Sequence, residues 1–416
     1  MYKRYTLENG LRVVTEHIPY VKSISIGVWI EAGSKNENPM NNGISHFIEH
    51  MLFKGTNKRT AKDIAETIDG IGGQINAFTS KECTCYYTKV LDSHYDLAID
   101  LLSDMLFNSK FDPIEIEKER SVILEEISMY EDSPEDLVHD ILTQTLFKNN
   151  SVGMPILGTK DTLSAIDREM INKYMQEYYV ANNAVLSVAG NFDEKLLLEA
   201  INSKFSIWNM NKNLKKDNTP IDFNFEKIYK NKDIEQSHIC IGFKGLELDN
   251  KYTYPLLVLN NILGGSMSSR LFQSIREERG LAYSIYSYPS IYKNGGSLVI
   301  YAGTNPNQIE EVISLIYSEI NDIIENSLSE EEVTKSKEQL KGNYILGLES
   351  TSGRMSSIGK SELLLNKIYT PKEILDKIDS VQLADINTVI KKIFNFEEVA
   401  VTAVGKREQI KSINKF

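Results

Sequence analysis

Long apolar runs and positive charge are both scarce in this sequence. No stretch reaches the roughly 18 consecutive apolar residues of a membrane-spanning helix, so we expect no transmembrane segment and no membrane partner. Lysine and arginine number 46 against 58 aspartates and glutamates, which gives a formal net charge of -12. Phosphate backbones and anionic membranes bind clustered basic residues. The acidic balance therefore argues against nucleic acid as a partner and favours neutral or basic ligands.

Cysteine is also rare, with three residues: Cys83, Cys85 and Cys240. The number is odd and the spacing does not match paired metal ligands, which favours free thiols in a reducing compartment. The N-terminus lacks the apolar core of a signal peptide, and the Asn9-Gly10 pair between two apolar runs predicts a hairpin. We therefore expect a soluble, cytoplasmic protein whose folded part begins almost at Met1.

Length and internal similarity predict two homologous domains. A chain of 416 residues exceeds the size at which one hydrophobic core usually stops growing. The strand-like run at 24–28 recurs at 239–243, and the run at 185–190 recurs at 400–405. Both pairs are offset by 215 residues, which indicates a duplicated unit.

Each half combines short β-rich runs with long helical patterns, such as the one at 113–129. The strands bunch rather than alternate strictly with helices, so an α+β arrangement is favoured over a doubly wound parallel sheet. A segment rich in asparagine and lysine, 209–220, is typical of a linker. We place the domains at residues 1–210 and 223–416, joined by a linker at 211–222.

One short helical pattern carries the first candidate site. Its apolar positions recur at helical spacing and predict one buried face, formed by Ile44, Phe47, Ile48, Met51 and Leu52. The opposite face carries His46, Glu49 and His50, and residues four apart stack on adjacent turns, so both imidazoles can reach one metal ion. This is H-x-x-E-H, the inverted order of the familiar zinc-protease motif. Histidines hydrogen-bonded within a core are the competing interpretation, but such a polar face is hard to satisfy without a cation.

A catalytic zinc needs a third protein ligand, and a second helical pattern can supply it. Asp112 and Pro113 are typical of a helix start. Glu119 and Glu126 share a helix face with apolar residues, so both carboxylates are expected to point inward, where they need a cation. A glutamate-rich helix considered alone is more often a solvated face.

The motif at 46–50, followed by a helical glutamate 76 positions after His50, resembles the M16 metallopeptidases. These include mitochondrial processing peptidase, insulin-degrading enzyme and shorter bacterial relatives. The resemblance covers essentially the whole chain, with further landmarks at 7–13, 72–79, 153–158 and 269–284. It implies a duplicated α+β fold of processing-peptidase type, in which each domain is a mainly antiparallel sheet with helices packed on one face.

The resemblance also implies the chemistry of the site. One zinc ion (Zn2+) per chain would be held by His46, His50 and Glu126, with Glu119 supporting the site. Glu49 would be the general base that takes a proton from the attacking water.

The second half of the chain lacks the motif. The 215-residue offset carries its three polar residues to Asn261, Gly264 and Gly265, so we expect no metal there. The glycine pair is not followed by the Lys-Ser or Lys-Thr of a phosphate loop.

Two further elements match family positions that handle substrate. Arg276 and Tyr283 match a pair that orients substrate and stabilises the reacting carbonyl, although a helix end with a packed tyrosine is the alternative. A short alternating run matches an edge strand that accepts the substrate as an added strand, and an ordinary covered edge is its alternative. That run consists of Gln74, Ile75, Asn76, Ala77 and Phe78.

We therefore expect a zinc-dependent endopeptidase that hydrolyses extended, unstructured peptides or processes presequences or leader peptides. Family members of this length work as two-subunit clamshells, which implies a homodimer with Arg276 and Tyr283 acting in trans, although the sequence does not distinguish it from a heterodimer. A non-catalytic assembly or partner subunit and a non-peptide zinc hydrolase are the competing functions. The other histidines lack partner spacing and are expected to be structural: His17, His94, His139 and His238.

Overall fold

The computed structural model describes residues 2–214 and 219–406. Contacts between residues divide the chain into two compact units, each drawn from three stretches of sequence. Neither unit is continuous, in contrast to the contiguous domains placed from the sequence at 1–210 and 223–416. Unit 1 comprises Met1–Ile127, Met154–Asp217 and Ile345–Thr370, and unit 2 comprises Ser128–Gly153, Asn218–Tyr344 and Pro371–Phe416.

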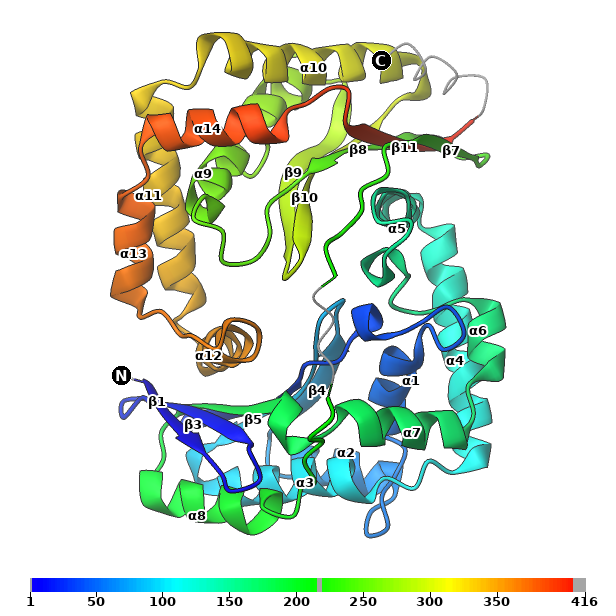
Figure 1. The fold of residues 1–416 in the computed structure, drawn as a ribbon, viewed down its shortest axis with the longest axis vertical. Coiled ribbons are helices and arrows are strands. Elements are labelled where there is room, and N and C mark those ends of the chain that lie inside the picture. The colour runs from blue at the N-terminus through cyan, green and yellow to red at the C-terminus, as the bar shows by residue number, and fades with distance from the viewer. Residues whose placement is uncertain (1, 215–218, 407–416) are drawn as a thin grey trace. The chain divides into compact units, whose positions relative to one another are not determined.

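Unit 1 is built on a six-stranded sheet with the order β1-β2-β6-β3-β5-β4, of which β1, β3, β4 and β5 are labelled in Figure 1. Neighbouring strands are antiparallel except β2 and β6, which run parallel. The predicted hairpin is present, since β1 pairs with β2 in antiparallel orientation. Gly10 adopts a φ of 86° in the turn between them. The strands are β1 (Tyr2–Thr6), β2 (Arg12–His17), β3 (Ser23–Ile30), β4 (Gln74–Thr79), β5 (Thr84–Leu91) and β6 (Ala184–Gly190).

Unit 2 has a five-stranded sheet with the order β7-β11-β8-β10-β9. Its parallel pair, β7 and β11, stands where β2 and β6 stand in unit 1. The strand order otherwise repeats that of unit 1, and the remaining pairs are antiparallel. The predicted fold class is confirmed. The strands are β7 (Lys227–Asn231), β8 (Ser237–Lys244), β9 (Ala282–Tyr292), β10 (Gly295–Thr304) and β11 (Val399–Gly405).

The 215-residue offset also holds for the helices. It carries α7 (Arg168–Tyr178) onto α14 (Leu383–Ile393) and β6 onto β11 with the same first and last positions. The other helices of the first half are α1 (Ile44–Met51), α2 (Ala61–Asp69), α3 (Tyr95–Asn108), α4 (Pro113–Asp132), α5 (Pro134–Leu146), α6 (Lys160–Ala165) and α8 (Glu194–Phe205). Those of the second half are α9 (Thr253–Leu263), α10 (Ile309–Asn326), α11 (Glu330–Gly347), α12 (Thr351–Leu365) and α13 (Pro371–Asp379). No helix among the described residues has the length and apolarity to cross a membrane.

Each sheet has a main helical layer on one face and a single helix from the other half of the sequence on the opposite face. In β2, Val13 belongs to the main core of unit 1, whereas the next residue, Val14, packs in a cluster with Met355 and Ile358 of α12. In the same way α5 packs against β8 and β11 of unit 2. The central strands are buried along nearly their whole length, so both of their faces need apolar cover. This exchange of α5 and α12 makes the units discontinuous in sequence.

The docking of α12 depends on a close approach at Gly359. A Cβ atom at this position would overlap Trp29 Nε1 and lie 2.6 Å from Ser187 Oγ, the two groups that are hydrogen-bonded to each other beneath the helix. We predict that Gly359→Ala lowers the free energy of unfolding of unit 1 by about 1–3 kcal/mol, because overpacking forces the helix away from the sheet. Both tryptophans, Trp29 and Trp208, lie in unit 1, so urea unfolding followed by tryptophan fluorescence measures the effect.

Gly342→Ala is the matched control. This glycine is exposed on α11 and no neighbouring atom lies within 4 Å of a Cβ placed there. Alanine favours the helix by about 0.5–1 kcal/mol over glycine, so the control should leave unit 1 unchanged and stabilise α11 slightly. Equal unfolding curves for Gly359→Ala and the unsubstituted protein would show that α12 does not pack as described.

Candidate metal centre

Helix α1 carries the histidine pair, and its burial follows the predicted periodicity. Ile44, Phe47, Ile48 and Met51 are buried in the main core of unit 1. The rings of His46 and His50 lie one turn apart, with centroids 4.7 Å from each other. The apolar face fixes the rotation of the helix, and this rotation sets the direction in which both imidazoles point.

The start of α1 is held by Glu37, a residue that the sequence analysis did not identify. Its carboxylate accepts hydrogen bonds from the backbone N–H groups of Gly43 at 2.7 Å and Ser45 at 2.9 Å. Burial raises the pKa of Glu37, and these amide donors partly offset the rise. A carboxylate here satisfies N–H groups that have no partner within the helix and interacts favourably with the helix dipole. The loop that contains Glu37 folds back on the helix, and no local sequence signal reports such a contact.

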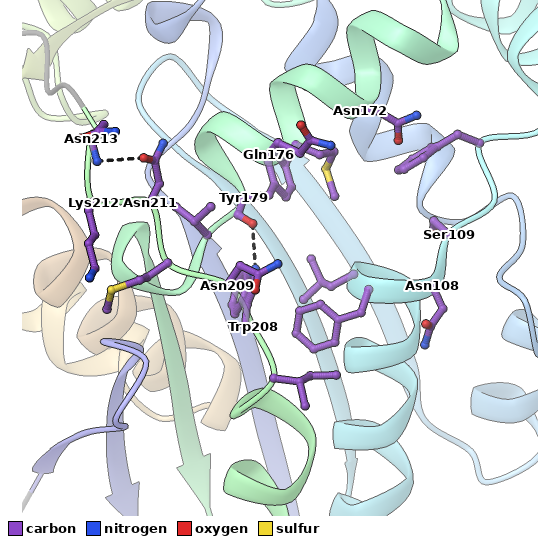
Figure 2. A pocket seen from close by; sticks show the side chains of 17 residues that line it. Asn108, Ser109, Asn172, Gln176, Tyr179, Trp208, Asn209, Asn211, Lys212 and Asn213 are labelled. Atoms are coloured by element: carbon purple, nitrogen blue, oxygen red, sulfur yellow. Dashed lines mark hydrogen bonds between the residues drawn. The ribbon is translucent and has the colours of Figure 1, made fainter.

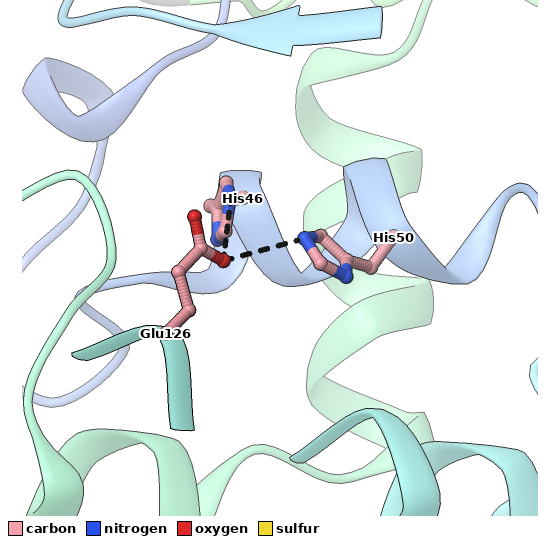
Figure 3. A group of neighbouring side chains, drawn as sticks. All are labelled: His46, His50 and Glu126. Carbon is pink, nitrogen blue, oxygen red and sulfur yellow. Dashed lines mark ion pairs between the residues drawn. The ribbon is translucent and has the colours of Figure 1, made fainter. Parts of the chain in front are cut away.

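Helix α4 brings the third candidate ligand to the histidine pair (Figure 3). One carboxylate oxygen of Glu126, Oε2, lies 3.8 Å from Nε2 of His46 and 3.7 Å from Nε2 of His50. One potential ligand atom from each of the three side chains lies within 4.8 Å of the others. The carboxylate therefore reaches the imidazole pair from a separate helix, as the metal-site hypothesis requires.

The charges at this cluster favour a bound cation. Burial, with a smaller contribution from nearby His50, lowers the pKa of His46 to about 3, so its imidazole is neutral at physiological pH. Burial raises the pKa of the Glu126 carboxyl. A histidine binds metal through its neutral imidazole, and a buried carboxylate gains from a nearby cation. Two imidazole nitrogens and one carboxylate oxygen match the three protein ligands of a catalytic zinc, whose fourth position takes water. The residues therefore fit zinc.

Glu119 lies behind the pair, in contact with His50. Its carboxylate oxygens contact Nδ1 of His50 at 3.1 Å and Nζ of Lys54 at 2.6 Å. This contact orients the imidazole so that Nε2 faces Glu126, the arrangement in which carboxylates hold metal-binding histidines. Of the two inward glutamates, Glu126 thus faces both rings and Glu119 faces the back of one. Nδ1 of His46 is buried and has no hydrogen-bond partner among the described residues.

Glu49, the candidate general base, lies on the same helix beside the cluster. Burial raises the pKa of its carboxyl, and a hydrogen bond from Thr79 opposes the rise. Thr79 Oγ1 donates to Glu49 Oε2 at 2.5 Å. Thr79 was not identified from the sequence either, because a threonine at the end of a strand is an ordinary residue and its neighbour on α1 lies 30 positions away.

The residues Gln74 to Phe78 lie in β4, the last strand at one side of the unit 1 sheet. Within the described residues β4 pairs only with β5, so its other side offers backbone groups to an added strand. Its exposed and half-buried side chains alternate along the strand. The strand is therefore an edge, and the part it plays in substrate binding stays a prediction.

Arg276 and Tyr283 lie in unit 2 and contact each other. Arg276 is in a short π-helix, η5 (Phe272–Glu277), and its guanidinium stacks over the rings of Phe272 at 4.6 Å and Tyr283 at 5.6 Å. Tyr283, near the start of β9, is 77% exposed, and its ring packs against the Arg276 guanidinium. Both side chains are accessible, and their catalytic roles stay predictions.

Unit 2 has an amide network where unit 1 has the candidate ligand cluster. Asn261 occupies the position of His46 after the 215-residue shift, and its Nδ2 donates to Ser336 Oγ and Gln339 Oε1, both at 3.0 Å. These acceptors lie on α11, the counterpart of α4. The same pair of helices thus holds ionisable groups in unit 1 and hydrogen-bonded neutral groups in unit 2.

A separate pocket of about 820 Å³ lies in unit 1 between the end of α3, α7 and residues 207–213 (Figure 2). Trp208 lines it and donates its Nε1 hydrogen to the Tyr179 carbonyl at 2.7 Å. Side-chain amides such as those of Asn172 and Gln176 also line it. No residue predicted to act in catalysis, metal binding or substrate binding lines this pocket.

Comparisons with known proteins identify the family of this chain. The family described as "Insulinase (Peptidase family M16)" matches residues 12–160, and "Peptidase M16 inactive domain" matches residues 165–340. A Bacillus subtilis (strain 168) relative named "Uncharacterized zinc protease YmxG" is 47% identical over 97% of this chain and 98% of its own. A Streptomyces coelicolor relative named "Uncharacterized zinc protease SCO5738" is 40% identical over 94% of this chain and 87% of its own.

A solved structure supports the fold. "The crystal structure of a protease from Helicobacter pylori" superposes with a TM-score of 0.91 and covers 97% of this chain and 99% of that one. Its 22% sequence identity makes it evidence for the fold alone. Similarity along nearly the full length of relatives that are named zinc proteases, together with the duplicated fold, leads to one conclusion: this chain belongs to peptidase family M16.

Proposed function

We propose that this protein is a zinc-dependent endopeptidase that cleaves extended peptides, including presequences or leader peptides. One observation carries the proposal: the nitrogen atoms of His46 and His50 and a carboxylate oxygen of Glu126 converge from two helices, with Glu49 beside them. This is the arrangement that metal-assisted hydrolysis needs, with three ligands and a base. The names of the relatives support zinc and proteolysis in general.

Zinc held by these three side chains would supply a Lewis acid that activates water and polarises the peptide carbonyl. Glu49 accepts the proton of the attacking water and passes it to the leaving amine. The raised pKa of its carboxyl suits both steps, because a group that takes up and releases a proton in one cycle works best when its pKa is close to the working pH. Glu119 keeps the His50 ring in place during the reaction.

The free edge of β4 supports an extended substrate. A peptide that adds to this edge pairs through backbone hydrogen bonds, which are largely indifferent to its side chains. Only a segment without its own secondary structure can offer its backbone in this way. We therefore propose unstructured peptides as the substrate class, with Asn76 and Ala77 in the pairing strand.

We further propose a homodimer in which Arg276 and Tyr283 of one subunit act on a peptide held by the other. Their exposure leaves them available to a substrate. We also assign the protein to the cytoplasm, a compartment that keeps thiols reduced, because all three cysteines are buried free thiols.

The ligand assignment predicts a loss of metal. Purified unsubstituted protein should contain close to one zinc ion per chain, and Glu126→Ala should lose most of it, because two imidazoles alone do not complete the site. Glu125→Ala is the matched control, since this neighbouring glutamate is exposed and lies outside the cluster. Zinc is measured by inductively coupled plasma mass spectrometry. A Glu126→Ala protein with full zinc content would refute the assignment, and a zinc-free unsubstituted protein would favour the non-catalytic subunit.

The base assignment predicts that Glu49→Gln keeps its zinc and loses turnover by about a hundredfold or more, because the amide cannot accept the proton. Activity is measured on a mixed library of unstructured peptides, which also reports the preferred cleavage sites. Glu125→Gln should cleave like the unsubstituted protein. Cleavage at the full rate by Glu49→Gln would contradict the role of Glu49.

The dimer model predicts complementation between two inactive variants. Glu126→Ala lacks the metal and Tyr283→Phe lacks the hydroxyl, so each protein alone should be nearly inactive. After subunit exchange, a mixed dimer has one complete site if Tyr283 acts in trans, so a random mixture should recover up to about a quarter of full activity. Activity that stays at the level of the separate variants, with exchange verified by native mass spectrometry, would contradict action in trans.

A further inference from the structure

The hydrogen bond between Thr79 and Glu49 links the end of β4 to the candidate base. Thr79 Oγ1 donates to Glu49 Oε2 at 2.5 Å. The nearby Thr84 hydroxyl donates its hydrogen bond to the Ala32 carbonyl at 2.8 Å. Its oxygen lies 3.4 Å from Thr79 Oγ1. An ionised carboxylate only accepts hydrogen bonds, so the Thr79 hydroxyl supplies the proton of this contact.

The turn that follows Thr79 is fixed to the segment before α1. The backbone N–H of Lys35 donates to the Lys81 carbonyl at 2.8 Å, and Lys35 Nζ is 2.8 Å from the Glu82 carboxylate in a buried ion pair. Gly33 lies so close to this turn that a Cβ atom there would overlap the Ser80 carbonyl oxygen. Thr79 is therefore presented from a rigid hairpin end.

The same segment fixes the other partner of the bond. Glu37, two residues after Lys35, accepts the hydrogen bonds from Gly43 and Ser45 that hold the start of α1. Residues 33–37 thus anchor both the hairpin end that carries Thr79 and the helix that carries Glu49. A contact with both ends anchored selects one conformation of a glutamate side chain that would otherwise rotate freely.

We propose that Thr79 is a positioning residue that holds the Glu49 carboxylate in the orientation needed for proton transfer. This rests on the proposed peptidase function and goes beyond it by adding a residue to the site. Oε2 is occupied by the threonine hydroxyl, which leaves Oε1 as the oxygen free to take the proton. Because Thr79 ends the strand that would pair with substrate, one strand fixes both the peptide and the base.

Thr79→Val tests the proposal, because valine keeps the β-branched shape and loses the donor. We expect unchanged zinc content, an unchanged KM and a kcat lower by about ten- to a hundredfold, as for a misplaced catalytic group. Thr79→Ser keeps a hydroxyl and should recover most of the kcat. The assay uses a short quenched-fluorescent peptide that the unsubstituted protein cleaves.

Thr88→Val on β5 of the same hairpin is the matched control, since Thr88 Oγ1 is buried and has no hydrogen-bond partner among the described residues. It should leave kcat unchanged. A Thr79→Val protein with the full kcat would overturn the proposal. So would a Thr79→Val protein whose loss of activity is explained by lost zinc or by a raised KM. Failure of Thr79→Ser to recover activity would also overturn it. An unsubstituted protein that binds zinc and cleaves no peptide would instead overturn the proposed function, so the two failures are distinguishable.

Discussion

The candidate metal centre depends on the packing of α1 and α4 in one core, which brings two imidazoles and a carboxylate together at a partly buried point. Burying a charged group without a partner costs free energy. This cost lowers the pKa of His46 and raises the pKa of Glu126. A divalent cation would remove it, because it would bind the two imidazoles and the carboxylate together. The apolar face of α1, the Glu37 cap and the Glu119 contact all serve to hold these ligand atoms in place.

The duplication shows how one fold supports two different interiors. Unit 2 repeats the strand order β2-β6-β3-β5-β4 and the facing helix pair of unit 1, yet Asn261 and its partners on α11 satisfy one another by neutral hydrogen bonds. The fold therefore does not require a metal. It supplies two facing helices, and the residues on them decide whether the space between is a candidate reaction centre or an ordinary core. The match of residues 165–340, which include α9 and most of α11, to an M16 domain described as inactive agrees with this division.

The local structure of α1 and the duplication could be predicted from the sequence, because periodic patterns indicate local structure and repeats indicate duplication. The apolar spacing of 44–52 gave the correct buried face of α1, and the two repeats at 215 residues were enough to indicate the duplication. The exchange of α5 and α12 could not be predicted, because an amphipathic helix does not specify which sheet it covers. The roles of Glu37 and Thr79 could not be predicted from the sequence for a related reason. Their contacts depend on the path of a loop and on where a strand ends, and both residue types are common in such places.

The central claim is that one zinc ion is bound by two imidazoles of α1 and one carboxylate of α4. Anomalous X-ray diffraction from crystals of the zinc-loaded protein, collected above and below the zinc absorption edge, tests it most directly. We predict one strong anomalous peak per chain, about 2.0–2.2 Å from Nε2 of His46, Nε2 of His50 and a carboxylate oxygen of Glu126. A peak bound by other residues, or a well-ordered cluster without a peak, would contradict the account.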